Sequence, residues 1–184
     1  LKSGNTRDGE LSAVSDEEQI KTSEDVETIS DKSDIDVPAV QTTTLLSTMA
    51  MPTMGKVITT FAVDSLVYSK TLEQWNSHHG IDIAGDLGTP VKAAMDGTVE
   101  NVMSNDPKLG VVVVIDHGAN IKTLYGNLAS DKLVKKGQTV KKGQVIGSVG
   151  NTSPYEIEDP PHLHFEVLQD GKNIDPQQYL PKLN

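Results

Sequence analysis

Short apolar segments alternate with turn-forming residues from Pro52 to the end of the chain. Most of the segments are rich in β-branched residues, and Gly, Pro, Asp and Asn lie between them. Segments of this kind predict strands, and no ten-residue helical period interrupts them. We therefore predict an all-β, antiparallel sandwich or barrel. The predicted strands cover residues 57–63, 81–84, 91–94, 98–102, 111–115, 121–125 and 163–168.

Two of these segments carry more specific predictions. The run from Val111 to Ile115 is continuously apolar, which is typical of a strand buried on both faces. The Asp96-Gly97 pair lies between the segments 91–94 and 98–102, and such a pair between β-rich runs predicts a hairpin turn.

A local repeat follows in the second half of the chain, where Val134-Lys135-Lys136-Gly137-Gln138 is echoed by Val140-Lys141-Lys142-Gly143-Gln144. Each unit places a glycine where the chain must turn tightly and a valine that faces inward. We interpret the four lysines as solvated turn residues; the alternative is a patch that binds a polyanion.

The beginning of the chain differs in composition from the rest. Residues 1–37 contain eleven acidic and four basic residues and few large apolar side chains. Such a stretch buries too little apolar surface to offset the entropy of ordering. We predict a flexible acidic tail and linker over residues 1–50 and a folded domain over residues 51–184. The tail is a spacer in this interpretation; the alternative is a segment that folds on a partner.

Charge and cysteine content exclude several functions. The chain has 26 acidic and 16 basic residues, so its net charge of −10 argues against binding to nucleic acid or to anionic lipid. Because it has no cysteine, disulfides, thiolate zinc sites and cysteine nucleophiles are excluded. It also has no apolar run long enough to span a membrane, so we expect any membrane anchor to lie upstream of Leu1.

Two histidine motifs are the candidates for chemistry. If residues 78–82 form one strand, His78 and Asp82 lie on the same face, and Gly80 between them leaves room for an ion. His162 and His164 share a face of another strand in the same way. If the two strands are neighbours, three or four nitrogen and oxygen ligands converge, and zinc accepts such a set. Either motif alone is more often an ordinary surface feature.

Further motifs accompany the histidines in order along residues 52–181. They are His78-x-Gly80-x-Asp82, Gly88-Thr89-Pro90-Val91, Ala94-x-Asp96-Gly97-x-Val99, Val140-Lys141-Lys142-Gly143-Gln144-Val145-Ile146-Gly147, Gly150-Asn151-Thr152, Pro161-His162-Leu163-His164-Phe165-Glu166-Val167 and Asp175-Pro176-x-x-Tyr179-Leu180. Together they resemble the lysostaphin/LytM-type zinc endopeptidase domain. The resemblance implies an antiparallel β-sandwich with a site in a groove, and hydrolysis of peptide cross-links in bacterial peptidoglycan.

The resemblance also implies roles for single residues. His78, Asp82 and His164 correspond to the ligands of Zn²⁺, and His162 corresponds to one of two catalytic histidines that do not bind the metal. His79 and His117 match no ligand. The second catalytic histidine is replaced by Asn127, which cannot carry a proton. We therefore expect weak or absent hydrolysis, and we expect Asn127→His to raise it; an active endopeptidase is the alternative.

A narrower resemblance is to sporulation members of this family, which are anchored in the forespore membrane. It implies an extracytoplasmic location, in the intermembrane space of the forespore. It also implies a partner in the opposing, mother-cell membrane that is similar to stage III sporulation protein AH. Peptidoglycan is a further candidate partner. A biotinyl/lipoyl-type carrier domain is a third hypothesis, but it lacks the modified lysine and leaves the His/Asp set unexplained.

Overall fold

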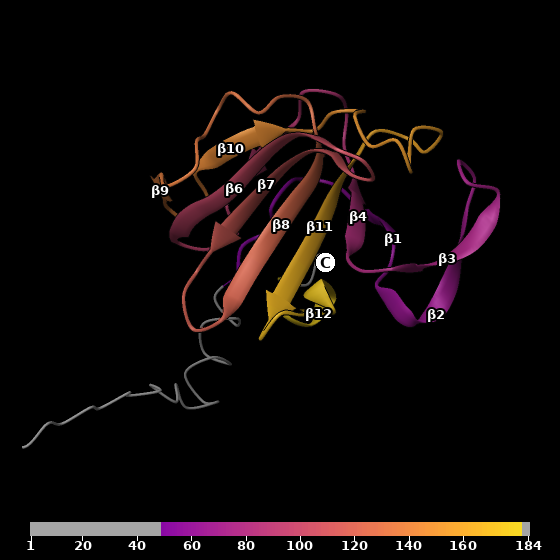
Figure 1. Ribbon diagram of the computed structural model, residues 1–184, viewed down its shortest axis with the longest axis horizontal. Helices are drawn as coiled ribbons and strands as arrows, with labels where there is room; N and C mark the ends of the chain where they lie inside the picture. The colour runs from indigo at the N-terminus through magenta and orange to yellow at the C-terminus, as the bar shows by residue number, and fades with distance from the viewer. Residues whose placement is uncertain (1–48, 182–184) are drawn as a thin grey trace, which may run out of the picture. The chain divides into compact units, whose positions relative to one another are not determined.

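The computed structural model describes residues 49–181 (Figure 1). The predictions for the acidic tail and most of the linker, residues 1–48, therefore lie outside the described residues. Within the described residues the only helical element is a three-residue 3-10 turn, η1 (Pro176–Gln178), and no helix there is long and apolar enough to cross a membrane. Every pair of strands in this part of the chain is antiparallel, as predicted.

Eight strands form one large sheet in the order β1-β4-β11-β8-β7-β6-β9, and β12 pairs with the end of β11 (Figure 1). The central strand β11 therefore lies between β4 and β8, although β4 is distant from it in the sequence. This arrangement brings the two predicted histidine motifs to adjacent positions. The strands are β1 (Val57–Thr59), β4 (Ile81–Ala84), β6 (Gly97–Asp106), β7 (Gly110–Asp116), β8 (Ile121–Leu128), β9 (Thr139–Val140), β11 (His162–Gln169) and β12 (Lys172–Ile174).

Two smaller two-stranded sheets complete the domain. One pairs β5 (Pro90–Lys92) with β10 (Val145–Ser148). The other is a hairpin of β2 (Ala62–Ser69) and β3 (Gln74–His78), which stands apart from the large sheet on the side of β1 (Figure 1). This hairpin is absent from the sequence-based prediction.

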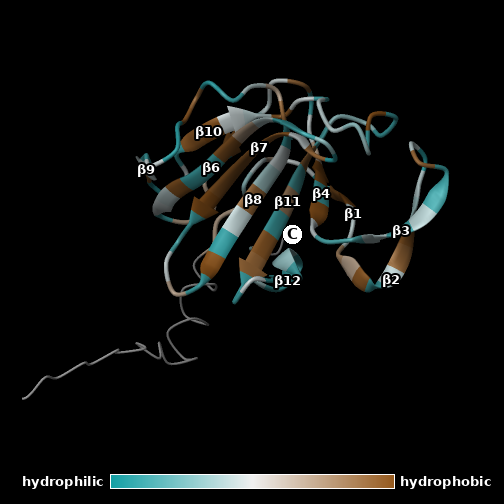
Figure 2. Ribbon diagram, viewed as in Figure 1, coloured by the Kyte–Doolittle hydropathy of each residue, from teal (hydrophilic) through white to brown (hydrophobic). Residues whose placement is uncertain are grey.

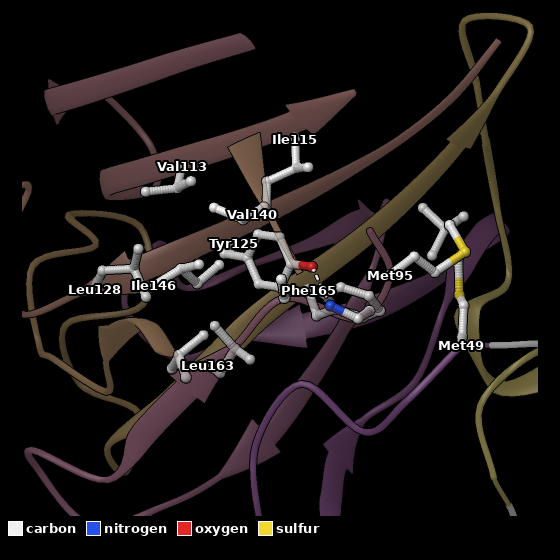
Figure 3. Close-up of a cluster of buried hydrophobic side chains, with 14 of the residues drawn as sticks. Met49, Met95, Val113, Ile115, Tyr125, Leu128, Val140, Ile146, Leu163 and Phe165 are labelled. Atoms are coloured by element: carbon white, nitrogen blue, oxygen red, sulfur yellow. Dashed lines mark hydrogen bonds between the residues drawn. The ribbon is translucent and has the colours of Figure 1, made fainter. Parts of the chain in front are cut away.

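The core lies against one face of the large sheet and contains side chains from β4, β7, β8 and β11. Tyr125 and Phe165 are fully buried at its centre, with ring centroids 5.3 Å apart (Figure 3). Each large apolar side chain buried in this way contributes about 1.5–3 kcal/mol to folding. Four of the five residues in the predicted buried strand 111–115 are buried and Val114 is half-buried, in agreement with the apolar colour of β7 in Figure 2.

The predicted strand 57–63 is wrong as a single element. β1 ends at Thr59 and pairs with β4, whereas β2 begins at Ala62 and pairs with β3. Between them the chain leaves the large sheet, and the carbonyl oxygen of Thr60 points toward the end of β3. There it accepts a hydrogen bond of 2.9 Å from His78 Nδ1.

The predicted hairpin at Asp96-Gly97 is also wrong. The flanking segments do not pair with each other, because β5 pairs with β10 and β6 pairs with β7 and β9. Gly97 instead permits a close approach to β7, since a Cβ there would lie 2.5 Å from the carbonyl oxygen of Asp116. The Asp96 carboxylate accepts hydrogen bonds from Lys142 N at 2.7 Å and Lys141 Nζ at 3.0 Å. Asp96 and Gly97 thus make tertiary contacts and do not form a hairpin turn.

The repeated Lys-Lys-Gly-Gln units form two equivalent turns. Gly137 and Gly143 have positive φ angles of 82° and 80°. Gly137 N donates to Val99 O and Gly143 N donates to Ala93 O, both at 2.8 Å. The valine that opens each unit is buried and the four lysines are exposed, as predicted.

Candidate metal centre

His164 and Asp82 lie directly opposite each other on the neighbouring strands β11 and β4. Their side chains point to the same face of the sheet, with His164 Nδ1 at 2.8 Å from Asp82 Oδ1. Both side chains are buried. Asp82 and His164, one from each motif, thus meet the condition of adjacent strands on which the predicted convergence of ligands depends.

His78 reaches the same point from the end of β3. Its Nε2 is 3.2 Å from Asp82 Oδ1 and 3.3 Å from His164 Nδ1. Residues 78–82 do not form one strand, so the condition for placing His78 and Asp82 on one face is not met; the chain bends between β3 and β4. Gly80 is buried at this bend, where a Cβ would lie 2.3 Å from the carbonyl oxygen of Phe165. Glycine is thus needed here for the close approach of β11, and not to leave room for an ion.

The orientation of both imidazole rings is fixed from outside the centre. His78 Nδ1–H donates to the Thr60 carbonyl oxygen at 2.9 Å, and His164 Nε2–H donates to Glu166 Oε1 at 3.2 Å. The remaining nitrogen of each ring therefore faces the centre, where it can present a lone pair to an ion that displaces its proton. Metal-binding histidines are usually oriented in this way by a carbonyl or a carboxylate.

The spacing of these atoms fits a small cation. In a tetrahedral zinc site with bonds of about 2.0–2.1 Å, neighbouring ligand atoms lie about 3.4 Å apart. The three separations among His78 Nε2, Asp82 Oδ1 and His164 Nδ1 are 2.8, 3.2 and 3.3 Å. Two imidazole nitrogens and a carboxylate are also donors that zinc accepts. The residues present thus fit a zinc ion.

The electrostatics of the centre favour a positive charge there. Burial works to raise the pKa of the Asp82 carboxyl, but the hydrogen bonds and charges of His164 and His78 hold it well below its usual range. Burial works to lower the pKa of His164, but its hydrogen bonds to Asp82 and Glu166 raise it well above the ordinary value. Both shifts stabilise a cation, a proton or a metal ion, between these groups.

Glu156 joins the centre from the segment between β10 and β11. It forms a four-residue group with His78, Asp82 and His164, in which the potential ligand atoms all lie within 4.8 Å of one another. Glu156 Oε1 is 3.5 Å from His164 Nδ1. The sequence-based prediction missed this residue, and no spacing or pattern around it indicates a ligand. It missed Glu166 too, although residues 162, 164 and 166 alternate onto one face of a strand.

His162 lies behind the centre and is almost fully buried. Its Nδ1–H donates to the Pro160 carbonyl oxygen at 2.8 Å, and its Nε2 is 3.2 Å from Glu156 Oε2 and 3.9 Å from Asp82 Oδ1. Burial works to lower the pKa of His162, but the hydrogen bond to Glu156 and the charge of Asp82 raise it. His162 thus lies within hydrogen-bond distance of Glu156, and the two groups form an ion pair when His162 is protonated.

Asn127, at the end of β8, is fully buried and has a positive φ of 58°. Its Oδ1 accepts hydrogen bonds from the backbone N–H groups of Thr152 and Ser153 at 2.7 and 3.0 Å. Its Nδ2 donates to the carbonyl oxygen of His162 at 3.1 Å and lies 3.5 Å from His162 Nε2. The amide thus fastens the segment before Glu156 to the large sheet.

With this geometry described, comparison with known proteins identifies the family. The profile of peptidase family M23 matches residues 76–176, which is more than half of the chain and contains the whole candidate centre. The chain belongs to peptidase family M23. The predicted all-β fold of the LytM/lysostaphin type is confirmed.

Among curated relatives of this M23 domain, the murein hydrolase activator NlpD of Escherichia coli is 33% identical over 141 residues, 77% of this chain and 33% of NlpD. The peptidoglycan DD-endopeptidase ShyA of Vibrio cholerae is 46% identical over 99 residues, 53% of this chain and 22% of ShyA. The chain thus spans a third or less of the length of these relatives.

Solved structures also resemble the M23 domain. A chain in the structure of the SpoIIQ–SpoIIIAH pore-forming complex superposes with a TM-score of 0.63 at 29% identity, covering 74% of this chain and 93% of that one. A zinc-containing peptidase from Vibrio cholerae superposes with a TM-score of 0.58 at 30% identity, covering 75% of this chain and 39% of that one.

The remaining histidines of the M23 domain lie outside the four-residue group. His79 is exposed, and its Nε2 is 3.3 Å from Ser77 Oγ. His117 lies at the start of the turn between β7 and β8 and bonds to Asp96 O and Thr123 Oγ1, both at 2.7 Å. A groove of about 290 Å³ opens in front of the candidate centre and is lined by His78, His79 and the hairpin of β2 and β3 among others.

Proposed function

We propose that this chain is an extracytoplasmic, zinc-binding M23 domain that acts as a binding scaffold and hydrolyses peptides weakly or not at all. We further propose that it works in the intermembrane space of the forespore during sporulation. The observation that carries the first part is the buried Asn127, whose amide is occupied by Thr152, Ser153 and His162.

The chemistry of an amide explains why this residue matters. Zinc, when bound, activates a water molecule and polarises a carbonyl group. The protein must still move a proton during attack and departure of the amine, and an amide cannot do so. Loss of a positioned acid–base group costs about 10²–10⁴-fold in rate. Because Asn127 Oδ1 already accepts two backbone N–H groups, the residue serves the fold of the loop.

An exposed apolar surface supports the scaffold role. Leu66, Tyr68 and Trp75 on the β2–β3 hairpin are 60%, 48% and 64% exposed. The Tyr68 and Trp75 rings are in edge-to-face contact, with centroids 5.5 Å apart. Exposed apolar clusters of this kind commonly mark protein-binding surfaces. The similarity to a chain of the SpoIIQ–SpoIIIAH complex supports a partner similar to stage III sporulation protein AH in the opposing membrane.

A binding titration tests the partner. The purified chain and its stage III sporulation protein AH-like partner should form a complex at micromolar concentration or below. Trp75→Ser should weaken the complex, whereas Leu133→Ser, which changes a 54% exposed leucine elsewhere on the domain, should not. No binding at micromolar concentration would contradict the sporulation role.

The second candidate function is an active endopeptidase that cleaves peptidoglycan cross-links. The close spacing of His78, Asp82 and His164 favours this function. The sequence identity to the peptidoglycan DD-endopeptidase ShyA also favours it. Release of soluble fragments from purified peptidoglycan tests this function. Release that is abolished by a chelator and by His162→Ala would establish hydrolysis and refute the inactive scaffold.

A further inference from the structure

We propose that Glu156 is a fourth, internal ligand that closes the metal centre, and that Asn127 is the positioning residue that holds it there. This inference rests on the proposed binding of zinc by His78, Asp82 and His164. It adds that the protein itself fills the position that a catalytic site leaves to water.

The first carboxylate oxygen of Glu156 faces the centre. Oε1 lies 3.5 Å from His164 Nδ1, close to the separation of about 3.4 Å that a tetrahedral zinc site requires. The side chain is only 14% exposed although it comes from a loop. Structural zinc sites have four protein ligands, whereas catalytic sites have three and an open position. With Glu156 in place, this centre has the ligand number of a structural site.

The second carboxylate oxygen of Glu156 contacts His162, the residue that corresponds to a catalytic histidine. Oε2 lies 3.2 Å from His162 Nε2 and 2.9 Å from Ser153 Oγ. His162 Nδ1 is already bonded to Pro160 O. Both ring nitrogens of His162 are therefore engaged within the protein, so Glu156 blocks the water position and the catalytic histidine with one carboxylate.

The loop that carries Glu156 is fastened at several points. Asn127 Oδ1 binds the N–H groups of Thr152 and Ser153. Ser153 Oγ also lies 2.7 Å from the Lys108 carbonyl oxygen. The turn continues with hydrogen bonds from Glu156 N to Ser153 O at 3.3 Å and from Asp159 N to Glu156 O at 3.0 Å. The loop that carries the carboxylate is thus held by contacts to β8 and to the turn that follows β6.

A spectroscopic experiment on the cobalt-substituted protein tests the proposal without reference to activity. Cobalt(II) reports the number of its ligands in the visible spectrum, and azide serves as a small added ligand. We expect azide to leave the spectrum of the wild-type protein unchanged and to change that of Glu156→Ala. Zinc affinity should fall in Glu156→Ala by at least the roughly 10–100-fold that loss of a residue supporting a metal site typically costs.

Matched variants separate the outcomes. Glu158→Ala removes an exposed acid from the same loop and should behave as the wild type. Glu156→Gln keeps the size of the side chain and should also lose zinc affinity, which covers the case in which the alanine variant does not fold. A wild-type spectrum that responds to azide as Glu156→Ala does, or an unchanged affinity in both variants, would overturn the inference. Absence of zinc binding in the wild type would overturn the proposed function instead.

Discussion

His164 Nδ1 and Asp82 Oδ1 lie 2.8 Å apart across the paired strands β11 and β4, although 82 positions separate the two residues in the sequence. Their contact depends on the register between these strands, in which His164 is the direct partner of Asp82. A slip of one residue would turn one of the side chains to the other face of the sheet. The candidate metal centre is therefore part of the framework of the fold, and we expect binding of an ion to stabilise the domain.

Replacement of a ligand should abolish this stabilisation. We expect zinc to raise the melting temperature of the wild type, and we expect His78→Ala to lose both zinc binding and this rise. The neighbouring His79→Ala should retain both, because His79 is exposed and lies outside the four-residue group. Elemental analysis and thermal melts with and without zinc measure the difference. Equal zinc content in the two variants would contradict the assignment of His78.

Glu166 should tune the centre without binding the ion. Its Oε1 accepts the hydrogen bond from His164 Nε2 at 3.2 Å, and its Oε2 accepts one from Asn173 Nδ2 at 2.7 Å. We expect Glu166→Gln to lower zinc affinity by about 10–100-fold. Competition with a chelator of known affinity measures this. Asn173→Ala serves as the control and should lower zinc affinity less, since Asn173 contacts only Glu166 Oε2, the oxygen that does not bond to His164. Equal losses of affinity in the two variants would argue against orientation of His164 by Glu166.

Gly80→Ala should destabilise the whole domain. The new Cβ would meet the carbonyl oxygen of Phe165 at 2.3 Å, and neither backbone segment can move without disturbing β11. We expect a loss of roughly 3 kcal/mol or more in the free energy of unfolding. Gly88→Ala meets no atom within 4 Å and should cost only the roughly 1–2 kcal/mol of its positive φ. Chemical denaturation compares the two; an equal cost would show that the bend relaxes freely.

A buried series of hydrogen bonds that begins at His117 predicts that the stability of the domain depends on pH. His117 Nδ1–H donates to Asp96 O at 2.7 Å, and His117 Nε2 accepts from Thr123, whose Oγ1 is 2.7 Å away. Thr123 Oγ1 is 3.0 Å from the Tyr125 hydroxyl, which accepts a hydrogen bond from Ala94 N at 2.8 Å. A second proton on His117 Nε2 would meet the Thr123 hydroxyl in a site that is largely removed from water. Burial, the largest cause, lowers the pKa of His117.

The sign of the effect follows from linkage. Because the folded-state pKa of His117 lies below the ordinary value of 6.5, the unfolded chain binds more protons between these two values. The contribution of His117 to stability is therefore present above pH 6.5 and is lost as the pH falls below it. The free energy of unfolding of the wild type should fall with decreasing pH relative to that of His117→Gln. A difference that is constant across this range would contradict the prediction.

The resemblance and the structure predict different effects of Asn127→His on hydrolysis. The resemblance alone predicts that this change raises hydrolysis. In the structure, the imidazole replaces an amide oxygen that accepts two backbone hydrogen bonds, so buried N–H groups lose their partner at about 1–3 kcal/mol. We expect lower stability and no gain in hydrolysis unless Glu156→Ala is added. Digestion of purified peptidoglycan by the single and double variants measures this, and a fully active single variant would refute it.

The parts of the fold that depend on local pattern could be predicted. Strand 111–115 is recognisable because its apolar run is uninterrupted, and the pair His162 and His164 because strand alternation brings their side chains to one face. The same argument fails for His78 and Asp82, because the bend at Gly80 separates them into β3 and β4. The Asp96-Gly97 hairpin was predicted wrongly because the partners of Asp96 lie 45 and 46 positions away, in the second Lys-Lys-Gly-Gln turn. Local turn chemistry cannot reveal such a tertiary contact.

The same distinction applies to the centre. His78, Asp82 and His164 belong to motifs, whereas Glu156 lies in an irregular loop whose path is set by Asn127, more than 20 positions earlier. The sequence indicated what Asn127 cannot do, which is to transfer a proton. It did not indicate that the amide holds the loop, because this requires knowing which N–H groups surround it.

The two equivalent turns have a consequence for how the chain folds. Gly137 and Gly143 are six positions apart, and so are their acceptors, Val99 and Ala93. The first turn carries the same Lys-Lys-Gly-Gln residues as the second, so it can occupy the second site with similar local contacts. A shift by one repeat would present the same residues to the same kind of acceptor, so the native register depends on contacts outside the two turns, such as the bridge between Val149 and Leu128.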